Sequence, residues 1–136
     1  MKEIKDTKRS KVYIGFSGKV SKQYLGPLAE ERYENEVRIL KYLEEKNCIF
    51  VPQIISEDSN ALKIFTTNCG MIVEKISSEK VQSLFKELED DYGVRHEDPF
   101  MRNITYNMHL GRFCIIDFEF AIIIETGVGL KLEEND

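Results

Sequence analysis

The chain has 136 residues, of which 42% are hydrophobic and 32% charged, and its formal net charge is −5. This length and composition predict one globular domain with a single core, and the acidic balance argues against general affinity for nucleic acid or anionic membranes. The charged N-terminus is not a signal peptide, and no apolar run approaches the roughly 18 residues of a membrane-spanning helix.

The first elements predicted along the chain are two strands. A charged leader, residues 1–10, precedes strands over 12–16 and 19–25, and Ser17-Gly18 between them is a hairpin turn signal.

A helix is expected next, from Pro27 to about Lys46. Proline suits a first helical turn, and the acidic residues after it suit the positive end of the helix dipole. Asn47 is a suitable stop. The stripe expected to face the core consists of Tyr33, Val37, Leu40 and Leu43.

The middle of the chain is predicted to add three strands. They are expected over 49–55, 62–66 and 71–76, because turn-rich sequences, EDSN and NCG, separate these apolar segments.

A second helix and a hairpin are predicted to follow. The helix is expected over 78–91, with Ser78 as its cap and Gly93 at its exit. Strands over 103–107 and 112–117 then flank a turn that contains glycine.

This order of strands, helix, strands, helix and hairpin indicates an α+β fold. An odd number of widely spaced cysteines fits neither a disulfide framework nor a metal knuckle, and it favours core thiols in a cytoplasmic protein. The single domain, 1–136, divides into an N-terminal lobe, a smaller lobe and a polar tail, at 11–76, 77–124 and 125–136.

Oxygen-bearing side chains should gather at the open end of the hairpin. Asn103 and Asp117 are equidistant from residue 110, so a turn centred there places them opposite each other. Asp98 lies in the loop that feeds the same end. Carboxylate and amide oxygens are ligands that Mg²⁺ prefers. The alternative is that Asn103 and Asp117 are ordinary turn residues.

An ion pair is a second candidate feature. Glu36 shares the helical spacing of Leu40 and Leu43, so its carboxylate should face the protein and need a cation. Lys22 lies on the strand before this helix and could supply that cation. The alternative is that both side chains are solvated.

Two motifs connect these features. HEDPFMRN, residues 96–103, fits H-x-D-x-x-x-x-N, and IIDFEFA, residues 115–121, follows with a further aspartate. They resemble the catalytic loop and the metal-binding segment of the protein-kinase-like superfamily. KVSKQYL resembles its lysine strand, ENEVRILKYL its αC helix, and MIVEKI the strand that enters its hinge. The resemblance covers about residues 12–121.

The resemblance implies a minimal kinase-like domain that binds Mg-ATP. Asp98 would accept the proton of the attacking hydroxyl, while Asn103 and Asp117 would hold Mg²⁺ on the phosphates. Lys22, held by Glu36, would contact the α- and β-phosphates.

It also implies roles for residues outside these motifs. The backbone of Glu74 to Ile76 would be the hinge that binds adenine, with Val73 at the back of the pocket. Phe118 would pack under the helix near Glu36. His96 is expected to brace the loop through backbone contacts rather than to act as a base.

Several positions depart from the protein-kinase pattern. Glu97 precedes the catalytic aspartate where arginine is usual, and Phe100 replaces a lysine. Glu119 replaces glycine in the metal-binding segment, and this variant is more similar to choline kinases and aminoglycoside phosphotransferases. Gly15 and Gly18 match a glycine-rich phosphate loop poorly and fit a simple turn better.

Two functions therefore compete. The leading hypothesis is a phosphotransferase that passes the γ-phosphate of Mg-ATP to a hydroxyl of a protein or a small molecule. The alternative is a nucleotide-binding pseudokinase that acts through a protein partner, because the sequence after Ala121 leaves little room for the elements that bind an acceptor. A partner protein or a second copy of the chain would then cover the reduced lobe.

Overall fold

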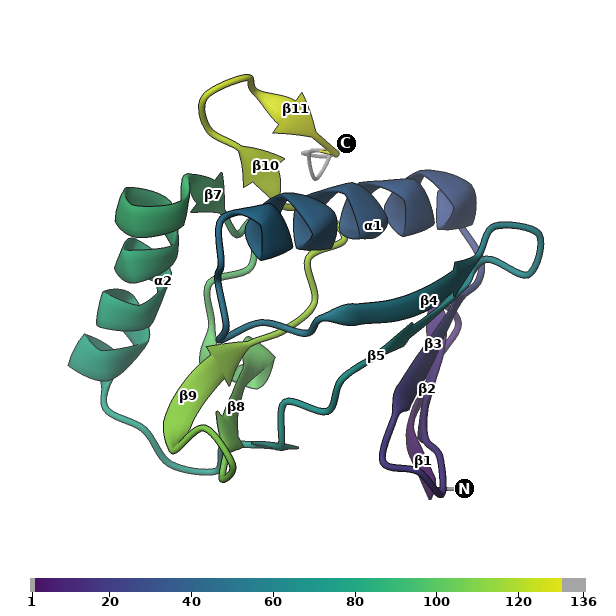
Figure 1. The fold of residues 1–136 in the computed structure, drawn as a ribbon, viewed down its shortest axis with the longest axis horizontal. Helices are drawn as coiled ribbons and strands as arrows, with labels where there is room; N and C mark the ends of the chain where they lie inside the picture. Colours follow the sequence, from purple (N-terminus) through teal and green to yellow (C-terminus); the bar gives the residue numbers. More distant parts are fainter. Residues whose placement is uncertain (1, 131–136) are drawn as a thin grey trace.

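The computed structural model describes residues 2–130 and has the predicted α+β fold (Figure 1). Its larger sheet is antiparallel, with five strands in the order β1-β2-β3-β5-β4. These strands are β1 (Lys2–Asp6), β2 (Ser10–Ile14), β3 (Val20–Tyr24), β4 (Ile54–Asp58) and β5 (Lys63–Thr66).

Helix α1 (Ala29–Glu45) runs along this sheet, as Figure 1 shows. The apolar stripe explains the packing: Tyr33, Leu40 and Leu43 are buried, and the ring of Tyr33 meets that of Tyr24 on β3 edge to face at 5.6 Å. Neither helix among residues 2–130 has the length and apolar character needed to span a bilayer.

The remaining helix and strands are α2 (Ser78–Tyr92) and those of two three-stranded sheets. One sheet joins β6 (Met71–Ile72) to the hairpin formed by β8 (Ile104–Asn107) and β9 (Arg112–Ile115). The other consists of β7 (Val94–Arg95), β10 (Ile122–Ile123) and β11 (Val128–Gly129). A 3₁₀ turn, Met101–Asn103, leads into β8.

Helix α2 begins and ends almost as predicted. Its cap is Ser77 rather than Ser78: the Ser77 hydroxyl accepts a hydrogen bond from the Lys80 amide at 3.1 Å. Gly93 follows the helix at φ 69°, a left-handed conformation that favours glycine.

Four of the predicted segment boundaries differ from the strands in the structure. Residues 2–6, expected in a leader, form the edge strand β1, because pairing with β2 satisfies their backbone. The strand predicted over 49–55 starts only at Ile54, and the one predicted over 71–76 is limited to Met71–Ile72. Part of the predicted tail forms β11, and residues 131–136 lie outside the described residues.

The register of the hairpin also differs from the prediction. Ile104 pairs with Ile115 and Asn107 with Arg112, so the turn is centred between residues 109 and 110. Asn103 consequently lies opposite Ile116, whose amide donates to its carbonyl at 2.9 Å, and Asp117 is one residue further on.

Candidate functional site

Lys22 lies at the centre of a buried cluster of charges. Its Nζ is 2.8 Å from Oε1 of Glu36, 2.7 Å from Oε2 of Glu119 and 3.4 Å from Oδ1 of Asp117. The ion pair considered between β3 and α1 is therefore present, because the alternation of β3 and the inner stripe of α1 bring Lys22 and Glu36 together. Tyr24, on the same face of β3, donates from its hydroxyl to Glu36.

Glu36 also fixes the segment that carries Asp117. Its Oε2 accepts a hydrogen bond from the backbone amide of Phe118 at 2.7 Å. Phe118 is fully buried, as expected from its predicted place under α1, and its ring packs against His96 at 5.1 Å. One helical carboxylate therefore positions both the lysine and the chain next to Asp117.

The sequence analysis did not identify the residue that pairs with the buried carboxylate of Glu119. Arg32 on α1 is 1% exposed, and its Nη1 lies 2.7 Å from Oε1 of Glu119. Arg32 therefore supplies a positive charge that compensates the buried carboxylate of Glu119. Arg32 precedes Glu36 by one helical turn, so the same spacing that placed Glu36 inward could have identified it.

The cluster shifts the pKa values of its members in opposite directions. Burial lowers the pKa of Lys22, but the carboxylates of Asp117, Glu36 and Glu119 outweigh burial and raise it well above its ordinary value. Burial alone would raise the pKa of Asp117, yet Lys22 holds it well below the usual range. Burial and the neighbouring carboxylates raise the pKa of Glu119 despite the opposing effect of Lys22.

Asp117 has an unusual backbone conformation. Its φ is +68°, in the left-handed region that costs most residues about 1–2 kcal/mol and that Asp and Asn adopt more readily than others. Its side chain is 31% exposed, the most of the three carboxylates around Lys22. Left-handed conformations of residues other than glycine occur often at functional sites, so this φ supports Asp117 as a candidate site residue.

The loop from His96 to Asn103 is organised by hydrogen bonds within it. Nδ1 of His96 accepts from the amide of Asp98 at 3.0 Å, so Nε2 carries the proton and donates to the Ile116 carbonyl at 3.0 Å. The expected bracing role of His96 is therefore met. The side-chain amide of Asn103 donates to the Asp98 carbonyl at 2.8 Å and to its Oδ2 at 2.7 Å.

The carboxylate of Asp98 has a second partner in Arg102. Nε of Arg102 donates to Oδ2 at 2.9 Å, and Nη2 donates to Oδ1. Arg102 is 67% exposed and also stacks on Phe100. Arg102 thus binds both carboxylate oxygens of Asp98 in this structure. Because Arg102 is exposed, water competes for these hydrogen bonds.

Asp98 and Asp117 line one open cavity of about 260 Å³. This volume is below the roughly 300–1,000 Å³ of pockets that enclose drug-sized ligands, so the cavity suits one end of a larger ligand. The residues from β1, β2, the loop and the segment around Asp117 that line it are Lys5, Arg9, Ser10, His96, Glu97, Asp98, Asp117, Glu119, Phe120 and Ala121.

The residues predicted to bind adenine do not line this cavity. Val73 follows β6, and its amide donates to the Ile104 carbonyl at 3.0 Å. Glu74 is exposed and Ile76 half-buried, in the connection to α2. Within residues 2–130, no recorded hydrogen bond or ion pair joins Val73, Glu74 or Ile76 to the Lys22 cluster, and none of the three lines the cavity.

The three-dimensional arrangement has a counterpart among solved structures. It matches the crystal structure of a Rio2 kinase from Chaetomium thermophilum, in complex with ADP/Mg²⁺-phosphoaspartate, with a TM-score of 0.64 over 92% of this chain. The fold is kinase-like. Sequence identity is 17%, and the chain spans half the length of that kinase, so the likeness concerns the fold alone. No protein-family model and no curated protein matches the sequence.

The donor groups of this kinase-like fold fit a divalent cation at Asp117 better than inside the cluster. Oxygens of Glu36, Asp117 and Glu119 lie within 4.8 Å of one another, but the ammonium of Lys22 already contacts all three. Asp117 is the carboxylate that reaches the cavity. The side-chain nitrogen of Asn103 donates two hydrogen bonds to Asp98. Its side-chain oxygen can therefore bind a hard cation.

Proposed function

We propose that the protein is a Mg-ATP-dependent phosphotransferase that transfers the γ-phosphate to a hydroxyl group. The observation that carries this proposal is the position of Lys22, paired with Glu36 and 3.4 Å from Asp117, beside a cavity that Asp98 also lines. Phosphoryl transfer depends on positioning and on charge neutralisation more than on covalent chemistry by the protein, which suits this set of groups.

Lys22 would contact the phosphates of the nucleotide. Its raised pKa keeps the ammonium protonated, although burial lowers that pKa, because the surrounding carboxylates outweigh burial. Glu36 would hold Lys22 in place from α1, while Glu119 and Arg32 balance the remaining charge. A lysine held between fixed carboxylates needs little rearrangement to meet an anion at the cavity.

Asp117 and Asn103 would hold Mg²⁺, which when bound neutralises charge on the transferred phosphoryl group. Burial raises the pKa of Asp117, but Lys22 and other charges outweigh burial and lower it. The carboxylate therefore stays ionised, which favours this role. Asp98 would orient the attacking hydroxyl and accept its proton, after the exposed Arg102 has released the carboxylate. Binding of adenine by the backbone of Glu74 to Ile76, with Val73 behind it, stays a prediction.

A second candidate is nucleotide binding without transfer, with the chain acting through a partner protein or a second copy. The pairing of both Asp98 oxygens with Arg102 favours it, because a base that remains paired cannot accept a proton.

Transfer of label from γ-labelled ATP distinguishes the two functions. The wild type should release or transfer labelled phosphate in a magnesium-dependent way, and Asp98→Asn should lose this by about 10²–10⁴-fold while still binding Mg-ATP. Binding of Mg-ATP without any turnover by the wild type would favour the second candidate. Equal turnover by wild type and Asp98→Asn would exclude Asp98 as the base.

A further inference from the structure

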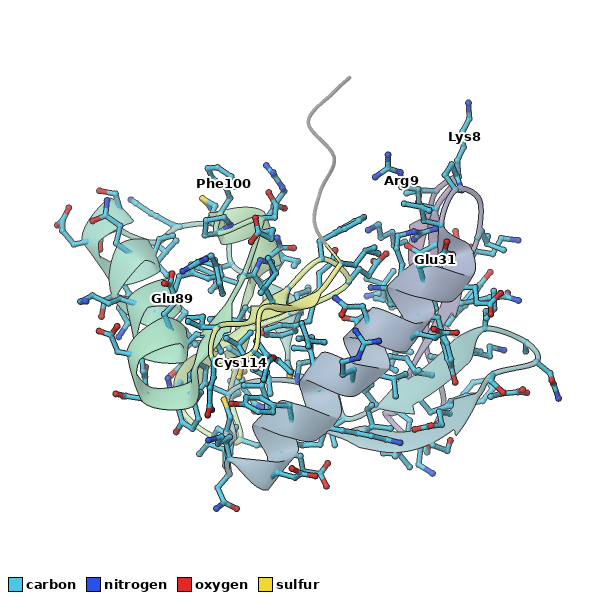
Figure 2. The ribbon with its side chains drawn as sticks, turned by 90° about the horizontal axis from the view of Figure 1, so that it is seen from above. Lys8, Arg9, Glu31, Glu89, Phe100 and Cys114 are labelled. Atoms are coloured by element: carbon cyan, nitrogen blue, oxygen red, sulfur yellow. The ribbon has the colours of Figure 1, made fainter. Side chains whose placement is uncertain are left out.

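One wall of the cavity is formed by residues of the first two strands and the turn between them. The proposed phosphotransferase gives these residues no role. The wall consists of Lys5 near the end of β1, Arg9 in the turn after it and Ser10 at the start of β2. Asp98 and Asp117 line the same cavity. The three residues of the wall lie in or beside the segment that the sequence suggested was only a leader. Figure 2 shows Lys8 extending outward from the turn that joins the two strands.

The two cations on this wall make no close side-chain pair with the side chains that the structure describes. Among the side chains that the structure describes, which do not include that of Asp6, neither Lys5 nor Arg9 takes part in a side-chain hydrogen bond or ion pair. Both side chains are exposed and line the cavity, and the positive charge of Lys5 interacts with the carboxylate of Asp117.

Ser10 gives an independent indication of a missing ligand. The residue is 1% exposed, and its Oγ has no hydrogen-bond partner among the described residues. Buried hydroxyl groups almost always have a partner, so an unsatisfied one on the wall of a cavity needs an explanation. A ligand oxygen in the cavity would supply the missing bond.

The turn that presents these side chains is well defined. Oγ1 of Thr7 accepts hydrogen bonds from the amides of Arg9 and Ser10, both at 3.1 Å. Arg32 donates to the Arg9 carbonyl at 3.2 Å and contacts Glu119 with the same Nη1. The wall is therefore tied through Arg32 to the segment that carries Asp117.

The charges of the cavity identify the class of ligand. Lys5 and Arg9 would repel a free metal ion, whereas Asp98, Asp117 and the neighbouring Glu97 would repel a free anion. A metal-bound polyphosphate presents both signs at once, with its metal towards carboxylates and its oxygens towards cations and hydroxyls.

We infer that Lys5, Arg9 and Ser10 form the polyphosphate-binding wall of the site, with side-chain cations in place of a glycine-rich loop. Gly15 and Gly18 lie in the turn between β2 and β3, where the Gly18 amide donates to the Gly15 carbonyl at 3.0 Å, and neither lines the cavity. The inference rests on the proposed nucleotide site and adds the residues that bind its phosphate chain.

Titration with three probes tests this wall. Mg-tripolyphosphate contains the phosphate chain alone, adenosine the nucleoside alone, and Mg-ATP both. Lys5→Ala and Arg9→Ala should each weaken binding of Mg-tripolyphosphate and Mg-ATP by roughly tenfold, as expected for one charge-assisted hydrogen bond. Adenosine affinity should stay unchanged. The matched control is Lys8→Ala, which removes the same charge one residue before Arg9, from a position that does not line the cavity.

The outcomes separate this inference from the proposed function. Unchanged affinity of the Lys5→Ala/Arg9→Ala double variant for Mg-ATP would overturn the inference and leave the nucleotide site standing. An equal loss in Lys8→Ala would also overturn it, since general charge would then explain the effect. Wild type that binds Mg-tripolyphosphate through Lys5 and Arg9, but neither Mg-ATP nor adenosine, would support the wall and refute the nucleotide site.

Discussion

Arg32→Met is expected to destabilise the protein strongly. The guanidinium is 1% exposed and pairs with Glu119, and it donates to the carbonyls of Pro27, Arg9 and Leu25. Removing one partner of a buried ion pair costs about 3–5 kcal/mol. The lower end applies here, because Glu119 retains Lys22. About 3 kcal/mol corresponds to a fall in Tm of roughly 9–15 °C for a domain of this size.

The companion variant Arg32→Met/Glu119→Met determines whether the pair is the cause. Replacing both partners with apolar side chains removes the unpaired charge, so the double variant should recover about half of the loss or more. Chemical denaturation followed by circular dichroism gives both free energies of unfolding. A loss below about 1 kcal/mol in Arg32→Met, or simple additivity of the two changes, would refute the role assigned to this pair.

Further variants and conditions test other parts of the account. Ser10→Ala should leave the free protein as stable as the wild type or stabilise it by about 1 kcal/mol in thermal unfolding, since it removes an unsatisfied buried hydroxyl; a loss above about 2 kcal/mol would mean that the hydroxyl has a structural partner. Arg102→Gln should change stability by less than about 1 kcal/mol in urea titrations, because its pair with Asp98 is solvent-exposed. Lys22 and other charges lower the pKa of Asp117 even though burial raises it, so its carboxylate stabilises the fold above its unfolded pKa of about 4, and that contribution is lost as the pH falls below it. The stability difference between wild type and Asp117→Asn, measured from pH 7 to pH 3, should therefore shrink in acid. Burial raises the pKa of Cys48 to about 12, so this thiol should react with an alkylating reagent only after unfolding, as mass spectrometry of the labelled protein would report.

Periodicity and turn signals predicted the parts of the fold that depend on local sequence. The inner stripe of α1, the glycine exit of α2 and the hairpin around Gly111 all follow from neighbouring residues, and the contact between Lys22 and Glu36 follows from two such patterns combined. The loop from His96 to Asn103 was singled out as a candidate by a motif with fixed spacing.

The remaining features depend on contacts between distant segments. Strand β1 is short and charged, and it is a strand only because β2 offers its edge. The place of Lys5 at the cavity follows from tertiary packing and leaves no periodic signal. Glu119 was seen as a departure from a motif, but its pairing with Arg32 joins positions 87 residues apart.

The most direct test of the central claim is thermal unfolding with and without Mg-ATP, on wild type and on Asp117→Asn. Asparagine accepts the φ of +68° at this position and leaves Lys22 with Glu36 and Glu119, so the variant should fold. Mg-ATP at about 100 times its Kd should stabilise the wild type by about 2.7 kcal/mol, a rise in Tm of several degrees. The account predicts that chelation of magnesium or the Asp117→Asn substitution removes this rise. No rise in wild type at millimolar Mg-ATP, or the same rise in Asp117→Asn, would contradict it.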